Sequence, residues 1–212
     1  AHGGEMPEVS VDPESDACIF YTSGTTGFPK GAQLTHRGCV ANLFNMLYAA
    51  ASSALAVERA TGVAPPATPP VPVTLVTTPL FHVTANNCAA YGVTAAGGAM
   101  VLMYRWDAGD ALKIIERERV TGMSGVPIMA RELITHPDFP STDTSSLLAL
   151  SGGGAQVPPD QVLKIDEAVE TARPTTGYGM TETCGIITSL GGDFYVDRPD
   201  SAGPAMPVYE AK

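Results

Sequence analysis

Residues 21–31 read YTSGTTGFPKG, and the interpretation of the whole chain starts from this loop. It follows residues 17–22 (ACIFYT), a short apolar and aromatic run that predicts a buried strand. Gly24, Gly27 and Gly31 permit backbone torsions and close approach that other residues resist, so successive amides can converge on phosphate oxygens. The stretch therefore predicts a phosphate-binding loop at the end of a strand.

The side chains of the loop suit the same ligand. Lys30 supplies a point charge that can lie against outer phosphates. The loop is not a Walker A motif, because Phe28 and Pro29 separate the glycines from the lysine and glycine follows that lysine. A P-loop NTPase is therefore disfavoured. Four hydroxyl groups can donate further hydrogen bonds to an anion: Thr22, Ser23, Thr25 and Thr26.

Downstream of the loop, the sequence predicts a long helix with Thr35 as its N-cap. Apolar residues recur along it at helical spacing and give one apolar stripe: Val40, Leu43, Phe44, Leu47 and Tyr48. The proline-rich residues 61–72 (TGVAPPATPPVP) cannot continue this helix, since proline removes amide donors. We interpret residues 61–72 as a surface loop and not as a domain boundary.

Strands and helices alternate through the rest of the chain. Helices are predicted over residues 86–96 and, capped by Asp107, through Arg119. Strands are predicted over residues 73–78, 99–103, 120–126 and 147–150. This alternation predicts an α/β fold with a mainly parallel sheet flanked by helices on both faces.

Three further stretches stand out beside the loop. Residues 177–183 read GYGMTET and are interpreted as a turn after the last strand. Residues 151–158 (SGGGAQVP) follow a predicted strand, and a plain strand-to-helix turn is the alternative there. Residues 79–82 (PLFH) end on His82, a candidate functional residue, although a lone histidine after a strand is more often structural.

Together these motifs resemble the signatures of the adenylate-forming superfamily, which includes acyl-CoA and aryl-CoA ligases, luciferases and peptide-synthetase adenylation domains. TSGTTGxPKG is its signature loop, and GYGMTET resembles its second signature. SGGGAQVP resembles its SGGAPLP stretch, except that Gln156 replaces a usual proline. PLFH resembles the segment that borders its acyl pocket.

The resemblance assigns expected roles to residues of this chain. Lys30, His82, Thr181 and Glu182 are expected to be catalytic, with His82 orienting the carboxylate and Glu182 as the magnesium ligand. Tyr178 is expected to stack on adenine. The residues expected to contact ATP are Thr22, Ser23, Gly24, Thr25, Thr26, Gly27, Lys30, Gly153, Gly154, Ala155, Thr176, Gly177, Tyr178 and Thr181.

The resemblance also implies a reaction. ATP activates a carboxylic acid as an acyl-adenylate, and coenzyme A as co-substrate then takes the acyl group, so the chain resembles part of an AMP-forming acid–thiol ligase. A fatty acid is the favoured substrate, because the presumed pocket is rich in Ala, Gly and Val. An aryl-CoA ligase or an amino-acid-activating domain shares every motif, although no charged partner for a substrate amine is evident. A non-catalytic nucleotide-binding module is the alternative of another class.

Composition limits the setting and the partners. A net charge of −10 and a pI near 4.7 argue against nucleic acid or an anionic membrane surface as a partner. Four separate cysteines without a CxxC pair suggest neither a zinc cluster nor a disulfide framework, so a reduced, cytoplasmic setting is expected. No signal peptide or membrane-spanning segment is expected.

The resemblance runs from about residue 16 to the end of the chain. The later aspartate motif that binds the ribose and the mobile C-terminal domain have no counterpart in this sequence. Residues 1–212 are therefore expected to be part of the large N-terminal ATP- and acyl-binding domain, and a poor catalyst alone because the missing groups complete and close the site.

Overall fold

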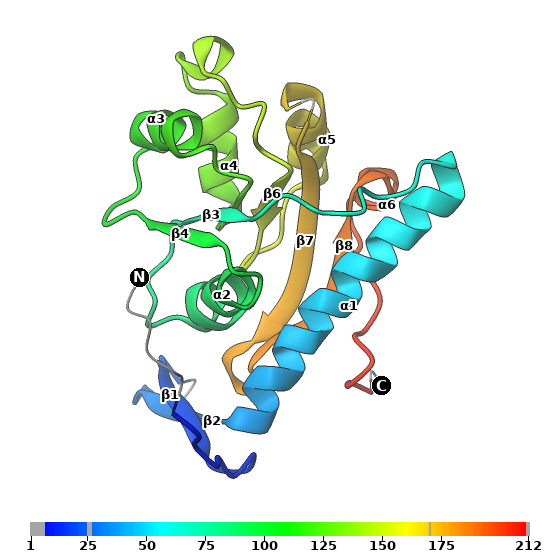
Figure 1. Cartoon of the computed structure of the whole chain (residues 1–212). Coiled ribbons are helices and arrows are strands. Elements are labelled where there is room, and N and C mark those ends of the chain that lie inside the picture. Colours follow the sequence, from blue (N-terminus) through cyan, green and yellow to red (C-terminus); the bar gives the residue numbers. More distant parts are fainter. Residues whose placement is uncertain (1–6, 25–26, 170, 211–212) are drawn as a thin grey trace.

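The computed structural model describes residues 7–24, 27–169 and 171–210, which form a hairpin and a six-stranded sheet with helices on both faces (Figure 1). The sheet has the strand order β4-β3-β5-β6-β7-β8. Its first five strands are parallel, and β8 runs antiparallel to β7. The strands are β3 (Val73–Val76), β4 (Ala99–Leu102), β5 (Gly122–Gly125), β6 (Ala149–Gly152), β7 (Arg173–Met180) and β8 (Gly185–Gly191). The predicted α/β class with a mainly parallel sheet is confirmed.

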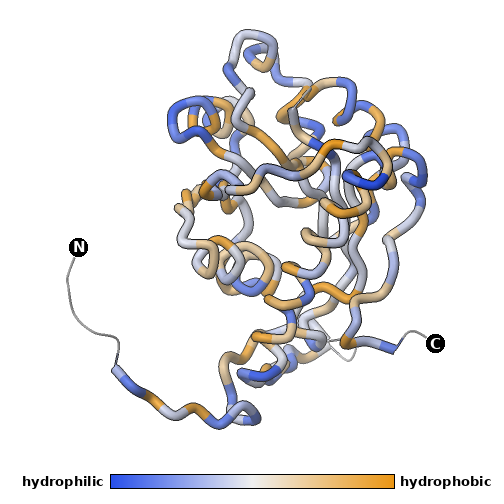
Figure 2. The backbone as a smooth tube through the Cα atoms, turned by 45° about the vertical axis from the view of Figure 1, so that its right-hand side comes forward, coloured by the Kyte–Doolittle hydropathy of each residue, from blue (hydrophilic) through white to orange (hydrophobic). Residues whose placement is uncertain are grey.

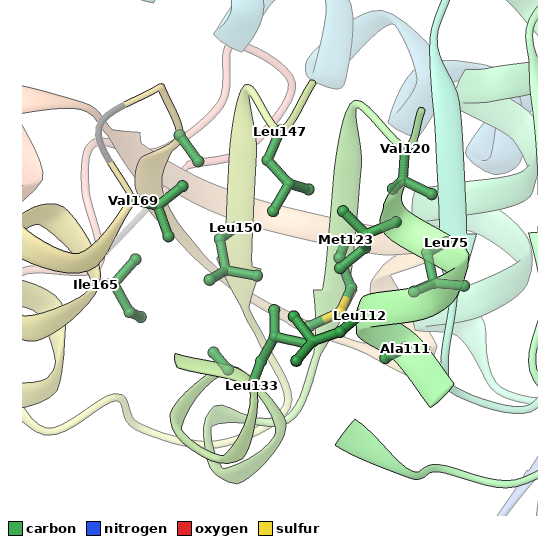
Figure 3. Close-up of a cluster of buried hydrophobic side chains, with 13 residues drawn as sticks. Leu75, Ala111, Leu112, Val120, Met123, Leu133, Leu147, Leu150, Ile165 and Val169 are labelled. Atoms are coloured by element: carbon green, nitrogen blue, oxygen red, sulfur yellow. The ribbon is translucent and has the colours of Figure 1, made fainter. Parts of the chain in front are cut away.

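The main hydrophobic core lies between this sheet and α3 (Ala108–Glu118), α4 (Pro127–Ile134) and α5 (Pro159–Ala168). Figure 3 shows the side chains that meet there, among them Leu75, Met123, Leu150, Leu112, Leu133 and Ile165. Each is at most 3% exposed. Burying one such side chain stabilises the fold by about 1.5–3 kcal/mol, so this face holds the sheet together.

The loop before α3 is fixed by two polar contacts at the edge of the core. Asp107 is the N-cap as predicted, because its carboxylate accepts a hydrogen bond from Asp110 N at 2.9 Å. Trp106 packs against the core, and its indole N–H donates to Glu132 Oε2 at 2.6 Å. The second contact joins this loop to α4.

The opposite face of the sheet carries η1 (Thr84–Ala90), α2 (Tyr91–Ala95) and α1 (His36–Thr61), which contacts both β8 and η1. The helix predicted over residues 86–96 is present, but its first part, η1, is a π-helix. By length and composition alone, α1 is long and apolar enough to cross a membrane. The expectation of no such segment is thus not confirmed, although here α1 packs along the sheet.

Helix α1 begins as predicted, with Thr35 Oγ1 accepting from Gly38 N at 3.2 Å. Most of the apolar stripe, however, faces outward: Phe44 is 63% exposed and Leu47 54% exposed, Val40 and Tyr48 are also exposed, and Leu43 is half-buried. The buried residues of the helix are Cys39, Asn42 and Asn45. Helical spacing showed which residues share a face, but the buried positions of this helix carry one cysteine and two asparagines.

The predicted first strand is present as β1 (Asp16–Thr22), but its expected burial is wrong. Among the described residues it pairs with β2 (Lys30–Thr35) alone, in an antiparallel hairpin at one end of the molecule (Figure 1 and Figure 2). Phe20 points inward, whereas Ile19 and Tyr21 are exposed. Side chains alternate between the two faces of a strand, and in the described structure only the face of the hairpin that carries Phe20 is covered.

The predicted turn over residues 177–183 is also corrected. Residues 177–180 belong to β7, and only η3 (Thr181–Thr183) turns the chain into β8. Thr61, the first residue of the predicted loop, instead ends α1, and residues 62–71, between α1 and β3, are exposed. Two short elements complete the list: η2 (Phe139–Ser141) and α6 (Asp193–Asp197).

Candidate functional site

The carboxyl ends of the parallel strands bring the glycine-rich stretch beside the second motif. Strands β6 and β7 are neighbours, with Gly152 opposite Thr176, so Gly153 and Gly154 lie next to Thr176 and Gly177. A Cβ atom built on Gly153 or Gly154 would meet no heavy atom of the described residues within 4 Å. The backbone of this edge is therefore open to a flat ligand. Ala155 follows and is exposed, as is Tyr178 on β7.

The phosphate-loop sequence connects the two strands of the hairpin. Thr22 pairs with Lys30 at its base, and Thr22 Oγ1 donates to Lys30 O at 3.5 Å. Gly24 has φ +63°, and a Cβ atom there would lie 2.4 Å from Phe28 O, so only glycine fits this turn. Ser23, Gly27 and Lys30 are exposed and available to an anion, whereas Thr25 and Thr26 lie outside the described residues.

The second motif meets this hairpin in space. Strand β2, which begins at Lys30, contacts η3, which contains Thr181 and Glu182. Thr183 Oγ1 holds that turn, since it accepts from Met180 N at 3.0 Å and donates to Gly185 O at 2.9 Å. Glu182 is exposed and Thr181 is half-buried. The fold thus brings together two motifs that are far apart in the sequence.

A small hydrophobic cluster anchors three of the motifs. It consists of Phe20, Leu34, Cys39, Val83 and Cys184. Phe20 and Leu34 come from the hairpin, Val83 directly follows PLFH, and Cys184 directly follows GYGMTET. The loop, the histidine segment and the second motif therefore share one support.

Two buried amides that the sequence reasoning missed fasten this support to the sheet. Asn42 Oδ1 accepts from Ile186 N at 2.9 Å, and Asn42 Nδ2 donates to Asn87 O at 3.1 Å. Asn87 Nδ2 in turn donates to Cys184 O at 2.8 Å. Asn42 and Asn45 interrupt an apolar run at i, i+3 spacing, and that interruption was the available signal.

His82 follows β3 at the same edge of the sheet and is exposed. Its Nδ1 accepts a hydrogen bond from Thr84 N at 3.2 Å. A neutral imidazole that accepts at Nδ1 carries its proton on Nε2. His82 can therefore donate from Nε2 to an oxygen of a ligand at the carboxyl edge.

The Glu182 carboxylate is a hard ligand that a magnesium ion would find in this region. Within the described ranges, no group of three or more His, Cys, Asp or Glu residues could hold a metal ion. Magnesium commonly binds one or two carboxylates together with substrate phosphates and water. A single exposed carboxylate beside a phosphate-binding loop fits that pattern.

The cysteines are free thiols, and several lie close together under the motifs. The side chains of Cys18 and Cys184 are each within hydrogen-bonding reach of Cys39. Burial, with smaller contributions from these neighbours, raises the pKa of Cys18 and of Cys184 to about 11. Burial likewise raises the pKa of Cys88 to about 11. These thiols are therefore uncharged at neutral pH.

A cavity of about 280 Å³ lies between the sheet and the helical segment η1–α2. Its sheet wall includes Thr74, Gly122, Ser124, Ala149 and Ser151. Ser124 and Ser151 directly precede the residues that end their strands, so the cavity continues along the strands from the open glycine edge. A second gap, beneath β6 and β7, has only about 10 Å³ and is too small for a substrate.

Comparison with known proteins defines the class. The fold is similar to the N-terminal domain of FACL13 from Mycobacterium tuberculosis, with a TM-score of 0.76, 26% identity, and coverage of 96% of this chain and 46% of that chain. It is also similar to o-succinylbenzoate CoA synthetase from Bacillus subtilis in complex with its acyl-adenylate intermediate, with a TM-score of 0.73, 28% identity, and coverage of 92% and 36%. The latter enzyme has also been solved with ATP and magnesium. The second neighbour is thus an enzyme that forms an acyl-adenylate.

Sequence comparison agrees. Residues 2–212 match the family described as AMP-binding enzyme, and the chain belongs to that family. It is 34% identical over 200 residues to a feruloyl-CoA synthase from an Amycolatopsis species, covering 94% of this chain and 37% of the relative. It is 31% identical over 192 residues to 4-coumarate–CoA ligase 2 from Oryza sativa, covering 89% and 31%. The chain thus spans about a third of the length of the curated relatives that it matches.

Proposed function

We propose that the full-length protein containing this chain is an AMP-forming acid–thiol ligase. It joins a carboxylate to the α-phosphate of ATP, releases pyrophosphate, and transfers the acyl group to the thiol of coenzyme A with release of AMP. The observation that carries the proposal is the contact between β2, which follows the phosphate loop, and η3 of the second motif. That contact assembles phosphate donors and a carboxylate at one edge of the sheet.

In this proposal each side chain of the site contacts a different part of the substrates. Lys30 and the loop amides offset the charge of the β- and γ-phosphates as pyrophosphate leaves. Thr181 donates to the α-phosphate, and Glu182 is the protein ligand for magnesium, which when bound offsets phosphate charge. His82 donates from Nε2 to the substrate carboxylate and orients it.

An aromatic acid replaces the fatty acid as the proposed substrate. The relatives' names specify ferulate and 4-coumarate, and the solved neighbour acts on o-succinylbenzoate. A cavity of about 280 Å³ is at the small end of ligand pockets, which favours a compact acid over a long alkyl chain. We assign this cavity to the part of the acid beyond its carboxylate. A cytoplasmic location remains a prediction from the free cysteines.

Pyrophosphate release by the full-length protein tests the proposal. The assay supplies ATP, magnesium and one acid at a time from a panel of hydroxycinnamates, benzoates and fatty acids of increasing length. We expect release with aromatic acids and little with acids longer than the cavity. Binding of ATP without acid-dependent release from any member of the panel would instead indicate a nucleotide-binding module.

A further inference from the structure

Gly122 occupies an unusual position in the cavity wall. It lies in the parallel sheet on β5, between Thr74 of β3 and Ala149 of β6 in register. Glycine weakens a strand interior, and it often marks a place where a ligand approaches the backbone closely. Thr74, Gly122 and Ala149 form one row across the sheet, and Gly122 at its centre has no side chain to project into the cavity.

The space above Gly122 belongs to the cavity. A Cβ atom built there would have Ala149 O as its nearest neighbour, at 4.0 Å, so a side chain would enter free volume and not protein. Gly92, on the helical wall, differs, because a Cβ atom there would meet Met46 Cε at 3.6 Å. Of these two glycines, only Gly122 opens onto unfilled space.

The position of Gly122, the first residue of β5, places it in the deep part of the cavity, which Pro72 also lines. Strand β5 runs from Gly122 toward the carboxyl edge, where the motifs lie, and Ser124 faces the cavity two residues nearer that edge. At about 3.3 Å per residue, Gly122 lies about 7 Å deeper than Ser124. An acid whose carboxylate is held at the edge would reach this row with its distal end.

We propose that Gly122 sets the depth of the acid-binding cavity and thereby the largest carboxylate that the enzyme accepts. The inference rests on the proposed function and specifies one selecting residue in its pocket. A side chain at position 122 would fill the notch between Thr74 and Ala149. Acids that extend to this row would then be rejected, whereas shorter acids would still fit.

A graded substitution series in the full-length protein tests this. Gly122→Ala and Gly122→Val are compared for kcat/KM with benzoate and with 4-hydroxycinnamate, in the pyrophosphate-release assay. We expect Gly122→Val to lower the value for 4-hydroxycinnamate at least about tenfold relative to benzoate, with Gly122→Ala intermediate, since a small mismatch in a pocket has effects of about this size. The KM for ATP should stay unchanged.

The control is Leu75→Met, a substitution that conserves side-chain volume on the core side of the adjacent strand β3. It should leave the ratio of kcat/KM for the two acids unaltered. If Gly122→Val fails to fold, the Ala variant decides. If the ratio of kcat/KM for the two acids is unchanged in the active Gly122 variants, including through equal losses for both acids, the role of Gly122 is overturned while the proposed function stands. No release by the unmodified protein with any acid overturns the proposed function and this inference with it.

Discussion

Lys30 is the residue whose charge the proposed chemistry needs most directly. It is exposed at the base of the phosphate loop. Replacing it in Lys30→Ala removes a charge-assisted contact, so we expect kcat/KM for ATP in the full-length protein to fall by about tenfold to a hundredfold. Steady-state kinetics at saturating acid measure this.

Lys113 provides the matched control for that loss of charge. It is an exposed lysine on α3, paired with Asp110 at 2.9 Å and outside the motifs. Lys113→Ala should leave the kinetics for ATP as they are. Equal effects of the two substitutions would show that Lys30 acts only through the net charge of the protein.

Glu182 allows the two half-reactions to be separated. Glu182→Gln keeps the shape of the side chain and removes its charge, so the adenylation step loses support for the phosphate charge. We expect pyrophosphate release to slow by about a hundredfold or more. Thioester formation from a preformed acyl-adenylate should suffer much less, because pyrophosphate is absent from that step. Equal losses in both half-reactions would mark Glu182 as a structural residue of η3.

Cys88 predicts a pH dependence of stability. Its folded-state pKa is raised by burial from 9.0 to about 11, so the unfolded chain releases this proton first as pH rises. Stability from Cys88 is therefore complete below pH 9 and is lost between about pH 9 and 11. Cys88→Ala lacks this thiol, so the difference in the free energy of unfolding between the parent and Cys88→Ala should fall by about 2 kcal/mol over this pH range. Denaturant unfolding at several pH values measures this difference. A constant difference would show that the thiol is solvated.

Among the elements, α1 predicts a contrast between two asparagines. Asn42→Ala leaves Ile186 N without its acceptor, so we expect the free energy of unfolding to fall by about 2–3 kcal/mol. Asn45 is also buried, but in the described structure its Nδ2 atom has no hydrogen-bond partner. Asn45→Leu should therefore change stability by no more than about 1 kcal/mol. Chemical denaturation followed by circular dichroism measures both, and a smaller cost at Asn42 than at Asn45 would contradict the hydrogen-bond network.

The same helix shows what a sequence pattern can and cannot predict. Thr35 and Asp107 were correctly predicted as N-caps, because a cap depends on residues within one turn. The outward orientation of Phe44 and Leu47 could not be predicted, since it depends on what packs against α1. The partners of Asn42 and Asn87 were equally hidden, because they lie far away in the sequence.

At the scale of the molecule, the alternation of strands and helices predicted the parallel sheet correctly. The edge where its carboxyl ends meet then follows from topology, which is why Gly153 and Thr176 lie side by side. The last two strands, β7 and the antiparallel β8, were missed, because residues 177–180 were taken for a turn when they belong to β7. The separate β1–β2 hairpin was also missed. The apolar run of residues 17–22 is so short that a strand buried on one face has the same pattern as a strand buried on both.

Trp106 gives the chain a built-in optical probe. It is the single tryptophan of the sequence, and its indole packs on the main core while donating to Glu132. The intrinsic fluorescence excited at the red edge of protein absorption therefore reports the environment between β4 and α4 and no other. Disruption of α3 and α4 will shift this emission, whereas rearrangements confined to the β1–β2 hairpin will leave it unchanged.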